Sequence, residues 1–359
     1  MRIVIYGSAG GPIPYLRGHQ FRAYWEAAGH EVVIVDSLRV TDDGLDASPF
    51  DGADVVVLRR LHFTGERYPE GQQDWISDSV IPWLAQQDIG LLWDVDDDLF
   101  HVPETNGYKP YIDDQREQVR TLARIADLVT VSTPYVGSIY APLNPNIRVL
   151  RNAIEPDAYR LLGETAPETE QPTLLYYGMG AKMYDLWAGR GYPVAAMVQW
   201  RKLYRGVFLG GTDLGGLEGL FDERREYHAD IRSWPAAMAG TRPDVGLAPL
   251  EPNLFSRARS ELHWLEYTAC GAATLASGMM GGGPYEVGGD ALRLARGRED
   301  WSRKLHELLV SAELRADLVG RSRERLQEGY TAEVRAAEWI DALQWVSDHR
   351  GIGARSAAA

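Results

Sequence analysis

The sequence predicts an α/β protein of two doubly wound domains, each a parallel sheet with helices on both faces. Continuous apolar runs alternate with segments of helical spacing, which is typical of strands buried on both faces. The alternation stops in a polar, proline-containing stretch at 160–172 and then starts again. With 359 residues, 45% of them hydrophobic, the chain can fill two cores.

The strands of both sheets can be assigned from these apolar runs. The expected strands of the first sheet are 2–6, 31–36, 54–60, 90–95, 128–132 and 147–150. The expected strands of the second sheet are 173–178, 206–211, 244–250, 273–277 and 291–295. Segments with the apolar spacing of helices lie between most of these runs. Because helices that connect successive strands are typical of parallel sheets, each sheet should be parallel.

Three structural parts follow from this pattern. We expect an N-terminal domain over residues 1–160 and a C-terminal domain over 173–335. One long helical stretch runs from about Asp300 to His349, and its last part, 336–350, is expected to pack back on the N-terminal domain.

Composition narrows the classes of function. The net charge of −14 disfavours general nucleic-acid binding, although it does not exclude a locally basic groove. The single cysteine, Cys270, excludes an intrachain disulfide and a cysteine-based metal cluster. No signal peptide and no apolar run of membrane-spanning length is recognisable, so we expect a cytoplasmic protein. Peripheral association with a membrane surface stays open.

The loop after the first strand is a candidate binding loop, because parallel sheets bind ligands outside the carboxyl ends of their strands. Gly10 and Gly11 allow the backbone to approach a ligand closely. Their spacing matches neither GxGxxG nor a P-loop. The loop therefore either lines a donor site or forms a simple turn.

An acidic cluster follows the fourth expected strand. Asp94, Asp96 and Asp97 lie in DVDDDLF, and His101 comes next. Three interpretations compete: a metal site, an acceptor site where a carboxylate binds or deprotonates a hydroxyl, and a solvated helix-capping cluster. The acceptor site makes these four residues catalytic candidates.

The second domain opens with a candidate diphosphate loop, YYGMGAKMYD. The backbone around Gly180 and the ammonium group of Lys182 together suit a diphosphate, with Arg190 as a further cation. The alternative is that Lys182 extends into solvent. Gly281, Gly282 and Gly283 follow a later strand, in a loop that either closes over a ligand or lies on the surface.

The segment SELHWLEYTACG predicts a helix that begins near Ser260. Its buried face would carry Leu262, Leu265 and Ala269. Arg259, His263 and Glu266 form an adjacent polar stripe at the boundary of this face. Glu266 can accept hydrogen bonds from two ribose hydroxyls, and the guanidinium of Arg259 can bind a phosphate through two N–H groups. The alternative is an ordinary amphipathic helix with a solvated polar face.

Several of these segments resemble the group 1, family-four-like retaining glycosyltransferases of bacteria and phages. The resemblance rests on WDVDDDLF, on ADLVTVST followed by RVLRNAIEPDAY, and above all on DVGLAPL with SELHWLEYTACGAATLAS. It covers most of the chain. It implies the GT-B fold, in which two Rossmann-like domains face each other across a cleft.

The resemblance also implies a function. Glu266 would bind the donor ribose, while Lys182 and the amides of 281–283 would lie near the diphosphate. The first of the family's two glutamates is replaced by Ala258, so the stereochemical outcome stays open.

We therefore expect a retaining, metal-independent glycosyltransferase that needs no cofactor besides a UDP- or GDP-linked sugar. The acceptor stays open among a glycan, a lipid-linked sugar, a protein and modified DNA, and so does the oligomeric state. A sugar-nucleotide epimerase and an inactive nucleotide-sugar-binding relative are the alternatives.

Overall fold

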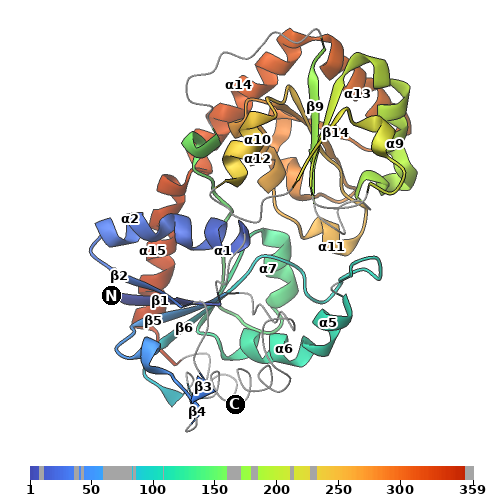
Figure 1. Ribbon diagram of the computed structural model, residues 1–359. Helices are drawn as coiled ribbons and strands as arrows, with labels where there is room; N and C mark the ends of the chain where they lie inside the picture. The colour runs from blue at the N-terminus through green and yellow to red at the C-terminus, as the bar shows by residue number, and fades with distance from the viewer. Residues whose placement is uncertain are drawn as a thin grey trace. The chain divides into compact units, whose positions relative to one another are not determined.

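The protein forms two compact units (Figure 1). The computed structural model describes residues 1–7, 12–35, 40–41, 44–59, 83, 86–107, 109–159, 171–178, 185–210, 214–226 and 233–351. The first unit comprises Met1–Phe100, Pro110–Arg151 and Ala332–Ala359. The second comprises His101–Lys109 and Asn152–Thr331. Most of the expected linker, residues 160–170, lies outside the described residues.

The first unit is built on a six-stranded parallel sheet. In sheet order its strands are β2 (Glu31–Val35), β1 (Arg2–Tyr6), β5 (Val55–Arg59), β6 (Gly90–Val95), β7 (Leu128–Val131) and β8 (Ile147–Val149). All five pairings are parallel, which confirms the predicted α/β class for this half of the chain. A small antiparallel pair joins β3 (Val40–Thr41) to β4 (Gly44–Leu45).

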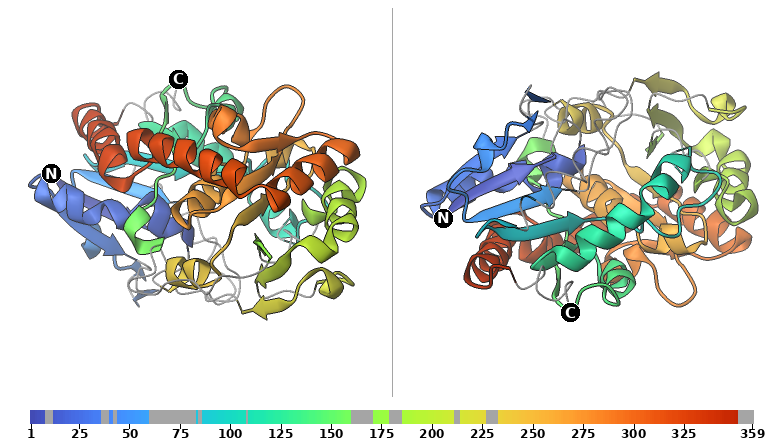
Figure 2. Two further views of the ribbon diagram at one scale, coloured as in Figure 1. Left: turned by 90° about the horizontal axis from the view of Figure 1, so that it is seen from above. Right: turned by 90° about the horizontal axis from the view of Figure 1, so that it is seen from below.

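Helices cover both faces of this sheet (Figures 1 and 2). They are α1 (Pro12–Arg17), α2 (Arg22–Ala27), α5 (Lys109–Asp114), α6 (Arg116–Ile125), α7 (Pro134–Tyr140) and α15 (Ala332–Asp348), with the 3-10 turns η1 (His19–Phe21) and η2 (Ser48–Phe50). Helices α2 and α15 pack together. Helix α2 connects β1 to β2 at one edge of the sheet, whereas α6 and α7 connect β6, β7 and β8 in order toward the other edge. Right-handed crossovers therefore place the two pairs on opposite faces.

Helix α15 closes the first unit. Its buried residues at helical spacing include Ala336, Trp339, Leu343 and Val346. The Trp339 ring lies 5.8 Å from the ring of Phe21 between centroids. Gly90 permits the close approach of this helix to β6, because a Cβ there would come 2.7 Å from Val346. The absence of a side chain at Gly90 therefore lets α15 pack closely against β6.

The second unit repeats the parallel architecture. In sheet order its strands are β11 (Glu223–Arg225), β10 (Arg205–Leu209), β9 (Thr173–Tyr177), β12 (Val245–Ala248), β13 (Ala273–Ser277) and β14 (Arg293–Ala295). All pairings are again parallel. The chain leaves β9 toward β10 and later returns to its other side as β12, so the strand order reverses between β9 and β12. Ligands bind at such a reversal in open α/β sheets.

The helices of the second unit also lie on both faces of its sheet. They are α9 (Ala188–Gln199), α10 (Trp234–Gly240), α11 (Leu254–Arg257), α12 (Leu262–Ala269), α13 (Arg298–Val310) and α14 (Ala312–Gly329). Short 3-10 segments are η4 (Pro156–Tyr159), η5 (Arg201–Leu203), η6 (Glu218–Leu220) and η7 (Pro284–Ala291). Helices α9 and α13 pack on each other, as do α12 and α14. None of the described helices combines the length and apolar composition needed to cross a lipid bilayer.

The expected single helical stretch from Asp300 to His349 is in fact three helices. The first break is at Ser311, whose hydroxyl accepts a hydrogen bond from the Leu314 amide at 3.1 Å and so caps α14. The second break is at Thr331, which pairs as a β-bridge with Ile154. Helical periodicity continues across both breaks, so the pattern alone predicted one element.

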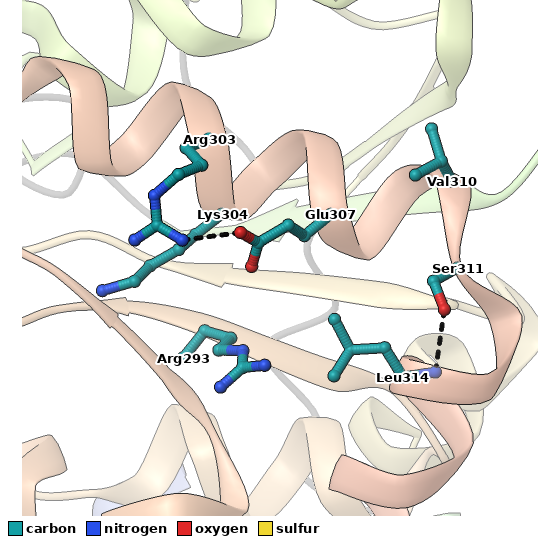
Figure 3. Close-up of a pocket in the computed structure, with 7 residues that line it drawn as sticks. All are labelled: Arg293, Arg303, Lys304, Glu307, Val310, Ser311 and Leu314. Atoms are coloured by element: carbon teal, nitrogen blue, oxygen red, sulfur yellow. Dashed lines mark hydrogen bonds and ion pairs between the residues drawn. The ribbon is translucent and has the colours of Figure 1, made fainter.

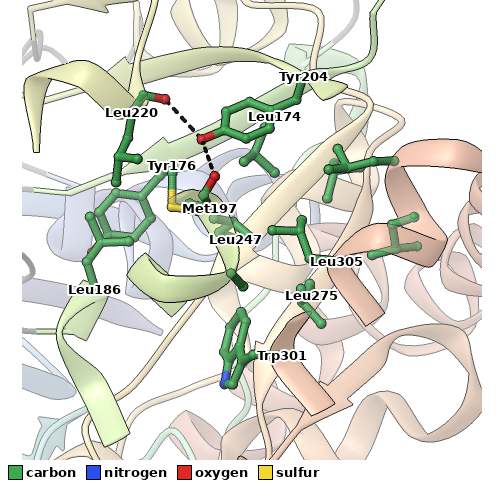
Figure 4. Close-up of a cluster of buried hydrophobic side chains, with 14 of the residues drawn as sticks. Leu174, Tyr176, Leu186, Met197, Tyr204, Leu220, Leu247, Leu275, Trp301 and Leu305 are labelled. Atoms are coloured by element: carbon green, nitrogen blue, oxygen red, sulfur yellow. Dashed lines mark hydrogen bonds between the residues drawn. The ribbon is translucent and has the colours of Figure 1, made fainter. Parts of the chain in front are cut away.

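The core of the second unit lies between its sheet and the pair α9 and α13 (Figure 4). Its members include Leu174, Tyr176, Leu247, Leu275, Met197, Trp301 and Leu305. The Tyr204 hydroxyl donates to the carbonyl of Leu220 at 3.2 Å, which satisfies a polar group inside this apolar cluster. Burial of each large apolar side chain contributes about 1.5–3 kcal/mol.

On the other face, a glycine sets the distance between β12 and α12. A Cβ at Gly246 would lie 2.2 Å from the Tyr267 ring, so the ring rests directly on the strand. The Tyr267 hydroxyl donates to the carbonyl of Leu247 at 2.8 Å, which fixes the ring from its far end. The strand and helix are therefore locked in register by one tyrosine.

Replacement of Gly246 by alanine should destabilise the protein by about 1–3 kcal/mol, because the added methyl overpacks a rigid ring. Urea denaturation measures the change. Gly320→Ala is the matched control, since a Cβ at Gly320 within α14 meets nothing within 4 Å. That control should stabilise the helix by about 0.5–1 kcal/mol. Equal stability of Gly246→Ala and wild type would contradict the described packing.

Candidate functional site

Helix α12 packs on β12 and β13 and carries Glu266, which lies beside Tyr177 at the carboxyl end of β9. The side chain of Glu266 is buried, with 2% exposed. Its Oε1 accepts hydrogen bonds from Trp234 Nε1 at 2.8 Å and from Tyr159 Oη at 3.0 Å, and its Oε2 accepts one from Tyr177 Oη. Hydrogen bonds to a charged group contribute about 1.5–3 kcal/mol each, which offsets the cost of burying a carboxylate.

The donors come from three separate elements. Tyr177 ends β9, Trp234 begins α10, and Tyr159 ends η4. Burial first, and then the charge of Glu266, raises the pKa of Tyr177 well above its usual value. The hydroxyl of Tyr177 therefore stays protonated and remains a donor at any physiological pH.

Aromatic side chains pack around the carboxylate of Glu266. The ring of Tyr177 lies 4.3 Å from His263, 5.1 Å from Trp234 and 5.4 Å from Tyr267 between centroids. His263 thus packs against Tyr177, which donates to Glu266. Rings with polar edges around a buried acid suit a ligand that has both hydroxyls and flat apolar faces.

Within the polar stripe of α12, Glu266 is buried more deeply than the sequence predicted, whereas Arg259 and His263 are half-buried. Of the expected buried face, only Leu265 is fully enclosed, while Leu262 and Ala269 are half-buried. Glu266 was expected at the boundary and is instead inside. The difference arises because η4 and α14 both pack on α12, in addition to the sheet.

Charged groups also gather near Tyr285, the second residue of η7. Burial first, and then Asp185, raises the pKa of Tyr285 above its usual value, while Arg259 opposes this change. The guanidinium of Arg259 lies 4.9 Å from the centroid of the Phe255 ring. Burial, followed by the charge of Glu266, raises the pKa of the half-buried Cys270 thiol, so this cysteine is not an activated nucleophile.

The glycine loop after β13 is internally tied. Gly281 and Gly282 have φ angles of 77° and 92°, which side-chain-bearing residues rarely adopt. The amide of Gly283 donates to Glu286 Oε2 at 2.7 Å, and the Gly282 amide reaches the carbonyl of Met279 at 3.3 Å. Arg257 donates to the carbonyl of Gly281. At least two of the three predicted diphosphate-binding amides therefore have partners within the chain.

Several predicted donor-site residues cannot be placed. Gly10, Gly11, Gly180 and Lys182 lie outside the described residues. Arg190 lies in α9, and its side chain is likewise outside the described part. Their roles stay predictions.

The acidic cluster of the first unit is centred on Asp94 in β6. Its carboxylate pairs with Arg17, accepts from Thr130 Oγ1 at 2.8 Å, and lies 3.5 Å from Nη2 of Arg59. Burial alone would raise the pKa of Asp94, but Arg17 and Arg59 reverse this and hold it below its usual value. Burial lowers the pKa of Arg59 to about 10 despite the attraction of Asp94. Asp94 is thus the centre of a buried ion pair.

The remaining acids of this cluster are buried too. Asp96 and Asp97 are at most 8% exposed, and their carbonyls accept from the hydroxyls of Ser132 and Tyr140. A solvated capping cluster is therefore the wrong interpretation. His101 is exposed and begins the segment His101–Lys109 of the second unit. Within the described part of the chain, no three histidine, cysteine or acidic side chains are arranged to hold a metal ion.

The sequence did not predict most of the residues that bind the carboxylates of Glu266 and Asp94. Tyr159 is 107 positions from Glu266, and no local pattern links them. Arg17 is 77 positions from Asp94. Tyr177 and Arg59 end buried strands, so the rule that ligands meet strand ends would have found both.

Comparison with known proteins supports the architecture. No protein-family profile matches this chain, and no curated protein matches its sequence. Among solved structures, sucrose-phosphate synthase from Thermosynechococcus elongatus is similar, with a TM-score of 0.68 at 14% identity over 96% of this chain and 99% of that one. The chain has the GT-B fold.

Other GT-B structures give the same result. HepE from Anabaena, solved with UDP-glucose, has a TM-score of 0.60 at 14% identity, over 95% of this chain and 100% of that one. An alpha-glucosyltransferase solved with UDP-glucose and DNA containing an abasic site has a TM-score of 0.63 at 11% identity, over 96% and 99%. The GT-B match therefore spans both sheets, and the predicted fold is confirmed.

Replacement of Asp94 by asparagine should destabilise the protein by about 3–5 kcal/mol at pH 7, because Arg17 and Arg59 lose their buried counter-charge. The folded-state pKa of Asp94 is lowered, so its contribution is present above the usual aspartate pKa of about 3.9 and is lost as pH falls through the folded value. Urea denaturation at pH values from 7 to 3 should show that the variant loses less stability than the wild type as the pH falls. The exposed Asp51→Asn is the control. A variant as stable as wild type would show that Asp94 does not hold the two arginines.

Proposed function

We propose that this protein transfers a sugar from a nucleotide-sugar donor to an acceptor hydroxyl. The carrying observation is the buried Glu266 at the carboxyl ends of β9 and β12, held by two tyrosines and one tryptophan. The GT-B fold adds support, since structures with this fold include proteins solved with UDP-glucose. A UDP-linked hexose is accordingly the first donor to test.

In this proposal Glu266 binds the ribose of the donor. A carboxylate has about four lone-pair sites, and the described donors approach two sites on Oε1 and one on Oε2. Tyrosine and tryptophan donors orient the carboxyl group through neutral hydrogen bonds, and its oxygens have further lone pairs that can accept from hydroxyl groups. Ribose hydroxyls would bind beside these donors or replace one of them.

Charge neutralisation on the departing diphosphate falls to Arg259 and Lys182. The glycosidic bond between the sugar carbon and the phosphate oxygen breaks, and the acceptor oxygen forms the new bond and gives up its proton. Cationic groups aimed at the diphosphate stabilise the charge that develops there. The glycine loop at 281–283, already tied by Glu286, would border the same group.

On the acceptor side, Asp94 is a poor general base. Its ion pairs lower its pKa and fill its oxygens, which opposes proton abstraction near neutral pH. The role then falls to Asp96, Asp97 or His101. Retention of configuration is what the family resemblance implies.

One observation favours a second candidate, a protein that binds nucleotide sugars without turning them over. Ala258, eight positions before Glu266, is fully buried and supplies no carboxylate. Binding of UDP-glucose without release of UDP in the presence of varied acceptors would favour this candidate over the transferase.

Replacement of Glu266 by glutamine should weaken UDP binding about tenfold or more, because charged hydrogen bonds of about 1.5–3 kcal/mol are lost. Isothermal titration with UDP and with UDP-glucose measures the change, and circular dichroism checks the fold. Glu324→Gln, an exposed glutamate on α14, is the matched control. Unchanged UDP affinity in a folded Glu266→Gln protein refutes the ribose role.

Tyr159→Phe tests whether a ribose hydroxyl competes for Glu266 Oε1. Loss of the tyrosine hydroxyl should lower stability by about 1.5–3 kcal/mol while UDP affinity rises, because the oxygen no longer has that donor. Parallel urea denaturation and UDP titration separate the two effects. A loss of UDP affinity would mean that Tyr159 positions the carboxylate instead of competing with the ligand.

A further inference from the structure

A separate hollow of about 580 Å³ lies against the edge of the second sheet (Figure 3). Arg293, the first residue of edge strand β14, reaches into it and faces the part of α13 that carries Arg303, Lys304 and Glu307. Val310 and Leu314 complete an apolar side. Because Arg293 lies at the amino end of its strand, this hollow is distinct from the loops that follow the strands.

Arg293 is the unusual group in this hollow. It is half-buried, and its Nε–H is shielded from solvent without an acceptor in the described part of the chain. It also forms no ion pair with any described residue. A shielded guanidinium N–H without an acceptor is unfavourable, so such a group normally pairs with an anion.

The neighbouring cations already have partners. Arg303 pairs with Asp300 at 2.7 Å and with Glu307 at 2.6 Å. Lys304 pairs with Asp300 at 2.8 Å. Three cations therefore face two anions, and the unbalanced positive charge belongs to Arg293. An entering anion would meet one guanidinium that is not already neutralised.

We propose that this hollow binds a small soluble phosphate monoester through Arg293. A guanidinium binds phosphate oxygens through two parallel N–H groups, and the nearby Arg303 and Lys304 favour a dianion over a monoanionic carboxylate. The volume is within the range of small-molecule sites and exceeds what an inorganic ion fills. The apolar side at Val310 and Leu314 suits the organic part of the ester. The site does not depend on the proposed transfer reaction.

Titration with glucose 6-phosphate at constant ionic strength tests the site, with glucose and acetate as reference ligands. The wild type should bind glucose 6-phosphate, and Arg293→Gln should bind it about tenfold more weakly. Arg293→Lys, which keeps the charge but loses the paired N–H groups, should fall between the two. Arg321→Gln is the control, because Arg321 is an exposed, ion-paired arginine on α14. Arg293 has no described partner to lose, so its variants should fold normally, as thermal melting can verify.

The same titration in saturating UDP separates this site from the donor site. Binding of glucose 6-phosphate should persist in UDP and in Glu266→Gln. Equal binding by wild type and Arg293→Gln overturns the proposal, as does equal binding of acetate, or loss of binding when UDP is added. A lipid headgroup is the other source of a phosphate monoester group. Arg293-dependent sedimentation with vesicles containing phosphatidic acid, without binding of glucose 6-phosphate, would overturn the assignment to a soluble ester.

Discussion

The organisation of the second unit depends on one buried charge, the carboxylate of Glu266. Three neutral donors from η4, β9 and α10 meet on it, although these elements are distant in the sequence. Removing a carboxylate from water is costly unless its oxygens are hydrogen-bonded. Hydrogen bonds to this one side chain of α12 therefore tie η4, β9 and α10 to the same helix.

The first unit meets the same requirement in a different way. Asp94 is as deeply buried as Glu266, but cations surround it, and Arg17 and Arg59 neutralise its charge. Removing one partner of such a pair leaves an uncompensated buried charge, and the pair leaves few free lone pairs on the carboxylate for a ligand. The described donors to Glu266 are instead neutral hydroxyl and indole groups. This contrast is why we propose ligand binding for the glutamate and a structural role for the aspartate.

The sequence predicted the repeated elements better than the contacts between them. Apolar strands such as β6 and β13 were located because burial on both faces leaves a continuous signal. Strand β11 was missed because its three residues, Glu223–Arg225, are all charged. The burial of Glu266 was underestimated, since helical periodicity describes one apolar face and α12 is covered on several sides.

The partners of the site were less predictable than its centre. Glu266 belongs to a recognisable segment, whereas the hydroxyl of Tyr159 reaches it through a fold-level contact that no local pattern encodes. Gly246 gives a second example. A side chain at this position would clash with the ring of Tyr267, which lies on another element. Long-range contacts of this kind follow from the packing of two elements, and sequence spacing carries no information about them.

A crystal structure with UDP bound is the most direct measurement of the central claim. The account predicts ribose hydroxyl oxygens about 2.7 Å from the carboxylate oxygens of Glu266, with the diphosphate directed toward Arg259. A nucleotide bound with its ribose elsewhere, and with the side chains of Tyr159, Tyr177 and Trp234 still enclosing the glutamate, would contradict it.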